Sequence, residues 1–324
     1  MFGAHVLIDR SQFPESVRGD LLESLRTRAI NHKFHYESYK QAAKWLALHE
    51  GFSPARTDAS CARIYDAAFT AAALEIASPA IHMAGLGCGG GQKEARLLKL
   101  LRAKANEVVC TLLDVSLPLV LTARVEVLPL VDRDYGIVCD LGTTENLDQV
   151  VSASDDKLPR IVTLFGILPN FEPAPLLFRI ARLLRPNDLL LISANLAPGS
   201  DYAAGVEKVL PQYDNTFTRD WLMTFLFDLG FEKSDGDLAF AIETDSRKLR
   251  RITAHFEVKQ TREVLVQNER FSFPAGERVR VFFSYRHTAA TMRSLLNEQA
   301  LDVIGEWLND TMEEGVFLCR KSAA

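Results

Sequence analysis

The alternation of apolar and polar positions divides the chain into stretches of different character. Residues 1–60 predict mostly helix, with one apolar face over 17–25. Asp58 is the expected N-cap of a further helix. The inner face of that helix is expected to hold Cys61, Ile64, Tyr65, Ala68 and Ala72. From about residue 79 short apolar runs alternate with helical stretches, which is typical of a parallel α/β sheet. Strands are predicted at 80–86, 108–114, 136–139, 160–166 and 188–195.

The pattern changes again after residue 196. Residues 205–230 predict helix. Alternating polarity then predicts antiparallel strands at 238–246, 251–259, 262–267 and 278–286. Residues 302–321 predict a helix or loop followed by one last strand. The pattern therefore indicates a nucleotide-binding α/β core, with an α+β insertion and an N-terminal helical piece.

A glycine-rich turn lies inside the stretch IHMAGLGCGGGQKEARLLKLL, residues 81–101. The stretch predicts a strand, a tight turn and a helix, and free N–H groups at a helix N-terminus suit an anion or a polar cofactor. The spacing Gly85-x-Gly87-x-x-Gly90 matches the dinucleotide pattern. It also fits the turn that methyltransferases place under the amino-acid part of S-adenosylmethionine (SAM). This turn by itself leaves NAD and SAM open.

Polar residues at the ends of the later predicted strands favour SAM. Asp114 can accept hydrogen bonds from both ribose hydroxyls, which fits either cofactor. The alternative is that Asp114 caps the next helix, a role that Ser116 can fill instead. Asp140 is placed to receive an adenine amino group, a feature of methyltransferases, although a turn-forming role is an equal alternative. Asn170 follows a buried strand that breaks at Gly166, where α/β folds place their chemistry.

Composition excludes several classes of function. The chain has 324 residues, 48% hydrophobic content and a net charge of −5, so it can bury a large core and offers no basic patch for nucleic acid. It has no apolar run long enough for a membrane span and no leader at its N-terminus, so we expect a cytoplasmic protein. Five cysteines without a C-x-x-C pair and seven histidines without a zinc pattern predict no metal. The expected partner is a small-molecule substrate, with monomer or dimer left open.

A family resemblance extends along nearly the whole chain. The segments that carry it are KFHY (33–36), FSPAR (52–56), GLGCGGGQKEARLLKLL (85–101), LDVS (113–116), GIVCDL (136–141), LFGILPNFEP (164–173), FPAGERVRVFFSYRH (273–287) and WLNDTMEEGVF (307–317). The chain resembles the histidine-specific, SAM-dependent methyltransferases of the ergothioneine type. The resemblance implies a class I methyltransferase sheet over 60–198 plus 286–324, and a substrate domain over 8–59 plus 199–285. It also implies methyl transfer to the α-amino group of a free amino acid, with S-adenosylhomocysteine (SAH) as product.

The resemblance also implies roles for individual residues. It places SAM against Gly85, Gly87, Cys88, Gly89, Asp114, Val115, Asp140, Leu141, Phe165 and Gly166. Asn170 matches an asparagine that holds the amino-acid end of the substrate, and Tyr36 matches a tyrosine near the amine, so both are the expected catalytic residues. The remaining substrate positions are Phe52, Ser53, Tyr202, Ala254, Phe282 and Ser284.

Departures from the family pattern argue against histidine as the acceptor. Phe282 occupies the position where the family has the glutamate that pairs with the imidazole, and Ala254 occupies a pocket position where the family usually has methionine. Without that polar partner the pocket loses its selection for imidazole, so we expect an aromatic or aliphatic amino acid or a related small amine. Gly85 replaces the acidic residue that the family usually has in the strand before the glycine turn. Phe52 and Ser53 replace a pair of tyrosines. These losses keep two alternatives open: an O- or C-methyltransferase of a specialised pathway, or a catalytically silent SAM-binding relative.

Aromatic residues outside these motifs are interpreted as packing. Trp45, Trp221 and Trp307 are expected as anchors of the core or of a domain interface rather than as cofactor contacts, and Phe171 as a packing residue. The sequence suggests no general base stronger than Tyr36 or a bound water.

Overall fold

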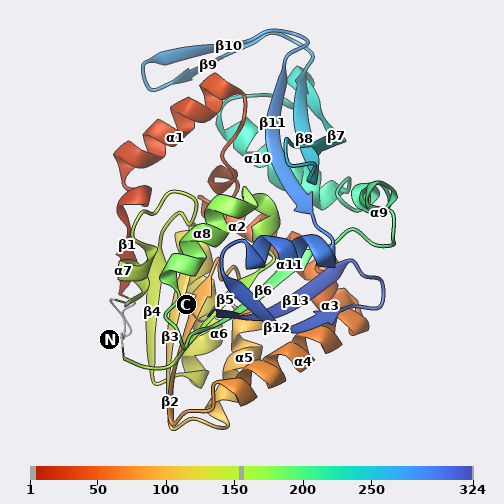
Figure 1. Cartoon of the computed structure of the whole chain (residues 1–324). Helices are drawn as coiled ribbons and strands as arrows, with labels where there is room; N and C mark the ends of the chain where they lie inside the picture. The colour runs from red at the N-terminus through yellow and green to blue at the C-terminus, as the bar shows by residue number, and fades with distance from the viewer. Residues whose placement is uncertain (1–4, 153–156, 323–324) are drawn as a thin grey trace.

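The structure is a computed structural model that describes residues 5–152 and 157–322. Its largest element is an eight-stranded sheet with helices on both faces (Figure 1). In spatial order the strands are β1 (Val6–Ile8), β4 (Arg133–Val138), β3 (Glu107–Asp114), β2 (Ala80–Leu86), β5 (Arg160–Phe165), β6 (Leu189–Asn195), β13 (Glu314–Lys321) and β12 (Leu301–Leu308). The first six run parallel, and the last two are antiparallel to their neighbours. This confirms the predicted Rossmann-like sheet.

Two apolar cores lie on the two faces of this sheet. One core packs against α4 (Ala59–Glu75), α5 (Gln92–Arg102) and α6 (Leu117–Val127). The other packs against α7 (Leu147–Ser152), α8 (Pro173–Leu183) and α11 (Ala289–Asn297). Asp58 caps α4 as predicted, because its Oδ1 accepts the N–H of Ser60 at 2.8 Å. The central strands are buried on both faces, which explains their continuous apolar runs.

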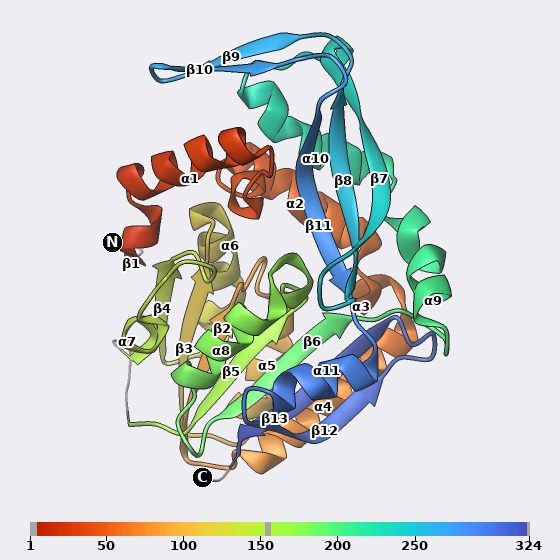
Figure 2. The ribbon, with the colours of Figure 1, turned by 45° about the horizontal axis from the view of Figure 1, so that its top comes forward.

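A second assembly lies above the carboxyl ends of the parallel strands (Figure 2). Its three-stranded antiparallel sheet has the order β11 (Arg278–Arg286), β8 (Arg250–Val258) and β7 (Gly236–Thr244). This sheet shares an apolar core with α1 (Pro14–Thr27) and α10 (Thr216–Asp228), against which α2 (Tyr39–Phe52) packs. A bulge between Arg280 and Phe282 interrupts the pairing of β11 with β8. The division of the chain into a cofactor domain and a substrate domain stays a prediction.

Several elements differ from the sequence prediction. Residues 301–308 form the edge strand β12 rather than a helix or loop, because an edge strand with solvent on one side lacks a continuous apolar run. Residues 6–8 form β1 beside β4, within the stretch predicted as helical. The predicted helix over 205–230 is broken: α9 (Tyr202–Val209) ends before Pro211, and Asn215 caps α10.

Two elements were not predicted at all. A short strand, β10 (Glu269–Phe273), pairs with β9 (Arg262–Val266) in a hairpin. Helix α11 precedes β12. None of the helices in the described part of the chain is long and apolar enough to cross a membrane.

Candidate active site

Two adjoining cavities lie where the parallel strands end. The inner cavity, of about 260 Å³, is lined by the Gly87–Gly90 turn, Asp114 and Asp140, among others. The outer cavity, of about 240 Å³, lies under the second assembly and is lined by residues from α2, α10 and β11. The residues that line both cavities are Tyr36, Trp45, His49, Ser53, Pro54, Asn170, Asn195 and Glu314. We call this set the shared wall.

The glycine turn joins β2 to α5 and forms the floor of the inner cavity. Gly87 and Gly89 adopt the left-handed region, with φ of 64° and 51°. A Cβ atom at Gly87 would lie 2.4 Å from Ile167 Cδ1, and one at Gly89 would lie 2.7 Å from the ring of Trp45. Both positions therefore require glycine, for backbone conformation and for space. Cys88 lines the same cavity.

Asp114 ends β3 at the wall of the inner cavity, next to Val115. Its Oδ2 accepts the N–H of Gly89 and its Oδ1 accepts the N–H of Ser116, both at 3.0 Å. Burial raises the pKa of this carboxyl to about 6, and the backbone N–H donors oppose the shift. Ser116 caps α6, as the sequence allowed, so Asp114 is not needed as a helix cap.

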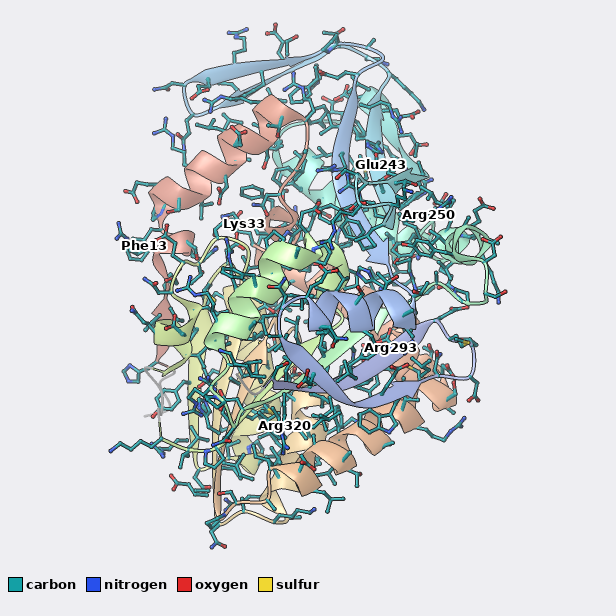
Figure 3. All side chains as sticks on the ribbon, viewed as in Figure 1. Phe13, Lys33, Glu243, Arg250, Arg293 and Arg320 are labelled. Carbon is teal, nitrogen blue, oxygen red and sulfur yellow. The ribbon has the colours of Figure 1, made fainter. Side chains whose placement is uncertain are left out.

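Asp140 has an oxygen with no hydrogen-bond partner. Its Oδ1 accepts the N–H of Gly142 at 2.7 Å, whereas Oδ2 is buried without a donor in the described residues. Lys33, labelled in Figure 3, lies with Nζ 3.9 Å from that oxygen. A buried acceptor of this kind suits a donor on a ligand, as expected for an adenine amino group.

The other predicted cofactor residues divide into two groups. Leu141, Phe165 and Gly166 line the inner cavity. Gly85 does not line it: it lies inside β2, where a Cβ atom would meet Glu94 Cγ at 3.2 Å. Phe171, interpreted from the sequence as packing, does line the inner cavity, and its ring contacts that of His32.

Aromatic rings form much of the outer cavity. Phe282 lines it and lies 6.0 Å from the rings of both Trp221 and Tyr213. Ser284 lines it too, and its Oγ accepts a hydrogen bond from the Tyr213 hydroxyl at 3.0 Å. Phe52 lies at the more exposed side of the cavity. The bulge in β11 precedes Phe282 directly, so it sets the face that this ring presents.

The tryptophans pack against cores, as expected, and two of them also line the cavities. Trp221 belongs to the core of the second assembly and Trp45 packs against it. Trp45 also lines both cavities and lies next to Gly89, and Trp221 also lines the outer cavity. Trp307 packs against the core, as expected.

Two predicted substrate residues lie outside both cavities. Ala254 is fully buried in the core of the second assembly, opposite Phe282 in the β8–β11 pair. The Tyr202 hydroxyl donates to the Arg286 carbonyl at 2.6 Å and accepts the N–H of Arg250 at 2.7 Å. It therefore fixes the end of β11 instead of facing a ligand.

The shared wall contains both predicted catalytic residues. Asn170 Nδ2 donates to the carbonyl of Phe283 at 2.8 Å, which leaves its Oδ1 as an acceptor. Tyr36 lies between Trp45 and Trp221, and its hydroxyl has no hydrogen-bond partner among the described residues. Burial raises the pKa of Tyr36 well above its usual value, so its hydroxyl stays protonated and acts as a donor. Ser53 completes this side of the wall.

Glu314 is a site residue that sequence reasoning missed. It begins β13 opposite Asn195 and is 5% exposed. The Tyr65 hydroxyl donates to its Oε1 at 2.6 Å, and Lys93 Nζ donates to the same hydroxyl at 2.9 Å. Burial raises the pKa of this carboxyl. The WLNDTMEEGVF segment marked the region, but only the pairing of β13 with β6 brings the carboxylate to the site.

The geometry fits the parts of SAM. A glycine turn, a strand-end carboxylate and an Asp140 oxygen that accepts no hydrogen bond from the described residues lie along one cavity, in the order of β2, β3 and β4. Comparison with protein-family models identifies residues 63–321 as a histidine-specific, SAM-dependent methyltransferase. The chain belongs to that family. It is therefore a SAM-dependent methyltransferase.

One solved structure agrees with the fold. A Thermobifida fusca YX protein described as a methyltransferase is 11% identical, with a TM-score of 0.51 over 88% of this chain and 90% of that chain. The Burkholderia thailandensis 1,6-didemethyltoxoflavin-N1-methyltransferase, solved with SAH, is 13% identical over 88% of this chain and 89% of that chain, with a TM-score of 0.46. No curated protein matches the sequence. In the described ranges no group of three His, Cys, Asp or Glu side chains is arranged to hold a metal.

Proposed function

We propose that this methyltransferase transfers a methyl group to the amino nitrogen of a small amino acid or related amine other than histidine, bound in the outer cavity. The observation that carries the proposal is a pair of buried, oppositely charged side chains lining this cavity. Glu314 offers a carboxylate for the amine, and Arg286 offers a guanidinium for a carboxylate. The aromatic rings beside them suit an apolar side chain.

Arg286 has the features of an anion-binding residue. It is 6% exposed and makes no salt bridge with any described residue. Its Nε donates to the Tyr213 hydroxyl at 3.1 Å and its Nη1 to the Leu196 carbonyl at 3.2 Å. Nη2 donates no hydrogen bond to any residue in the described part of the chain. Burial raises the pKa of Glu314 and the charge of Arg286 opposes that shift, but no carboxylate of the described residues contacts the guanidinium directly. A buried guanidinium without a direct carboxylate contact favours an anionic ligand, because charged groups are seldom buried unpaired.

The shared wall can position the amine and remove its proton. SAM supplies a methyl group on a positively charged sulfur, which an amine lone pair can attack. Asn170 Oδ1 can accept a hydrogen bond from the amine, and the Tyr36 hydroxyl can donate to the carboxylate end. Positioning of this kind lowers the barrier by about 7–11 kcal/mol when the geometry is well held.

Glu314 is the best proton acceptor of the shared wall. An efficient general base has a pKa near the working pH, and burial moves the pKa of Glu314 upward in that direction. His49 is the other titratable candidate, but burial lowers its pKa to about 3, which makes it a weak base. The carboxylate of Glu314 also attracts the ammonium form of the acceptor before the proton leaves.

The test is a screen of acceptors with product analysis. The protein is incubated with SAM and with each standard amino acid, and SAH and methylated products are detected by mass spectrometry. We expect methylation on nitrogen, first for aromatic and aliphatic amino acids. Fragments that place the methyl group on oxygen or carbon would contradict the proposal. SAM binding by calorimetry without turnover of any acceptor would indicate a silent relative.

A matched pair of acceptors tests Arg286. Arg286→Gln should raise KM for phenylalanine by about tenfold or more, because a charge-assisted bond to the carboxylate is lost. Phenethylamine lacks that carboxylate, so its KM should not change. The exposed Arg293→Gln variant serves as control. An equal rise in KM for phenylalanine and phenethylamine would mean that Arg286 only supports the fold.

A substitution at Phe282 tests the specificity. Phe282→Glu restores a carboxylate at the position where the family pairs with imidazole, so the ratio of kcat/KM for histidine to that for phenylalanine should rise. Phe282→Leu, which stays apolar, should not raise this ratio. No change with either variant would argue that Phe282 does not contact the acceptor.

A further inference from the structure

The inner cavity contains a buried carboxylate that has no role in the proposed methyl transfer. Glu94 lies in the first turn of α5, is 3% exposed and lines the cavity beside the glycine turn. Glutamate is seldom buried to this degree without a charged partner. Burial of this carboxylate would be explained if a cation of the protein were bound to it.

The protein gives Glu94 little compensation for its burial. Among the side chains of residues 5–152 and 157–322, Thr163 alone donates a hydrogen bond to it, from Oγ1 at a long 3.4 Å. It makes no salt bridge with any described residue, and the neighbouring Lys93 donates instead to Tyr65. Burial raises the pKa of Glu94 to about 7, although its own backbone N–H and Lys93 oppose the shift. The carboxylate thus faces the cofactor cavity without a cation of its own.

Glu94 occupies the space beside Gly85. A Cβ atom at Gly85 would lie 3.2 Å from Glu94 Cγ and 3.3 Å from Leu112 Cδ2. A side chain at position 85 would therefore project toward the space that the Glu94 side chain now fills. Gly85 is also the position where the sequence pattern lacks its usual acidic residue. The Glu94 carboxylate of the helix therefore lies close to the position where an acidic residue at 85 would place its own carboxylate.

The order of the strands places this carboxylate at one end of the cofactor. Asp140 follows β4 and Asp114 ends β3, so the adenosine half lies on that side of the glycine turn. The Glu94 side chain reaches from α5 to Thr163 of β5, the strand that flanks β2 on the side away from β3. A cofactor that extends across the turn brings its amino-acid end to this side. That end carries an ammonium group.

We propose that Glu94 binds the α-ammonium group of SAM and replaces, from the helix, the carboxylate that position 85 lacks. The inference depends on the cofactor and not on the identity of the acceptor. It makes Glu94 a cofactor-binding residue that lies within the segment 85–101 but has no role in its sequence pattern.

Two ligands that differ by the amino-acid part test the proposal. SAH carries the ammonium group, whereas methylthioadenosine has the same adenosine and sulfur without it. By calorimetry, Glu94→Gln should weaken SAH binding by about tenfold or more and leave methylthioadenosine binding unchanged. The exposed Glu269→Gln variant is the control. Because methylthioadenosine binding reports a folded inner cavity, a folding defect is separated from the loss of one contact.

A second variant restores the carboxylate from the strand. Gly85→Asp combined with Glu94→Ala removes the Cγ that a side chain at 85 would meet and returns a carboxylate to β2. We expect it to recover most of the SAH affinity lost in Glu94→Ala alone. Unchanged SAH binding in Glu94→Gln, or an equal loss for both ligands, would overturn the proposal.

Discussion

Asp114→Asn tests the cofactor site with a substitution that hardly changes the size of the side chain. The two Asp114 oxygens accept the N–H groups of Gly89 and Ser116, and the side chain faces the inner cavity. An asparagine retains one of these acceptors, and its NH₂ group replaces the other. The substitution also removes the negative charge that strengthens hydrogen bonds from ribose hydroxyls.

The magnitude follows from the bonds that are lost. A hydrogen bond to a charged group contributes about 1.5–3 kcal/mol. Loss of one such bond weakens binding by about 12-fold to about 150-fold. The ribose is common to SAM, SAH and methylthioadenosine, so all three should weaken by a similar factor. This distinguishes Asp114 from Glu94, whose substitution should affect only the ligands that carry the ammonium group.

The pH dependence gives an independent signature. The carboxyl of Asp114 has a pKa raised to about 6 by burial, and it must be ionised to accept both hydroxyls. Affinity should therefore be full above that pKa and should fall as the pH drops through about 6, by linkage between proton and ligand. Methylthioadenosine is the ligand for this titration, because it lacks the group that Glu94 would bind.

Calorimetric titrations with methylthioadenosine at several pH values decide the matter. The wild-type affinity should fall toward acid, whereas that of Asp114→Asn should be low and nearly independent of pH. Asp310→Asn, at an exposed side chain, is the control. Normal affinity in Asp114→Asn, or an unchanged pH profile, would show that the adenosine half does not contact this carboxylate.

Two further substitutions test the turn and the core. Gly89→Ala should abolish measurable SAH binding, because φ is 51° and the new Cβ would lie 2.7 Å from the Trp45 ring; retained binding by calorimetry would refute this reading of the turn. Asp188→Asn should lower the free energy of unfolding by about 3–5 kcal/mol, since it breaks the buried pair with Arg160 at 2.6 Å. Glu269→Gln breaks only an exposed pair and should cost less than about 1 kcal/mol, so similar urea midpoints for these two variants would contradict the argument.

The sequence predicted the sheet well because its central strands are buried on both faces. Strands such as 80–86 and 160–165 appear as continuous apolar runs bounded by turns, and such runs are easily recognised. The prediction for residues 301–308 was wrong for the opposite reason. These residues form the edge strand β12, and its exposed positions interrupt the run of apolar residues. The break of the 205–230 helix carried a local signal, Pro211 followed by Asn215, that the prediction did not use.

The predicted residues that lie together at the inner cavity are those that belong to short motifs. Gly87, Gly89 and Asp114 each follow directly from a strand end, so their positions in the chain fix their positions in space. Tyr36 and Glu314 come from opposite ends of the chain and meet only because the second assembly and β13 pack beside the same cavity. No periodicity reports a contact of that kind.

The departures from the family pattern acquire two different meanings once the structure is considered. At Phe282 an aromatic ring lines the outer cavity where the family has a carboxylate, so under the proposed function the acceptor site becomes less polar. At Gly85 the space is filled by Glu94, so the charge is retained although the residue is lost. A sequence pattern records both as losses. Because Glu94 follows Gly85 by several residues and reaches its place through the turn into α5, only the folded chain distinguishes a lost group from a relocated one. The same reasoning weakens the case for a silent relative, since one of the departures that suggested it leaves a carboxylate in the cofactor cavity.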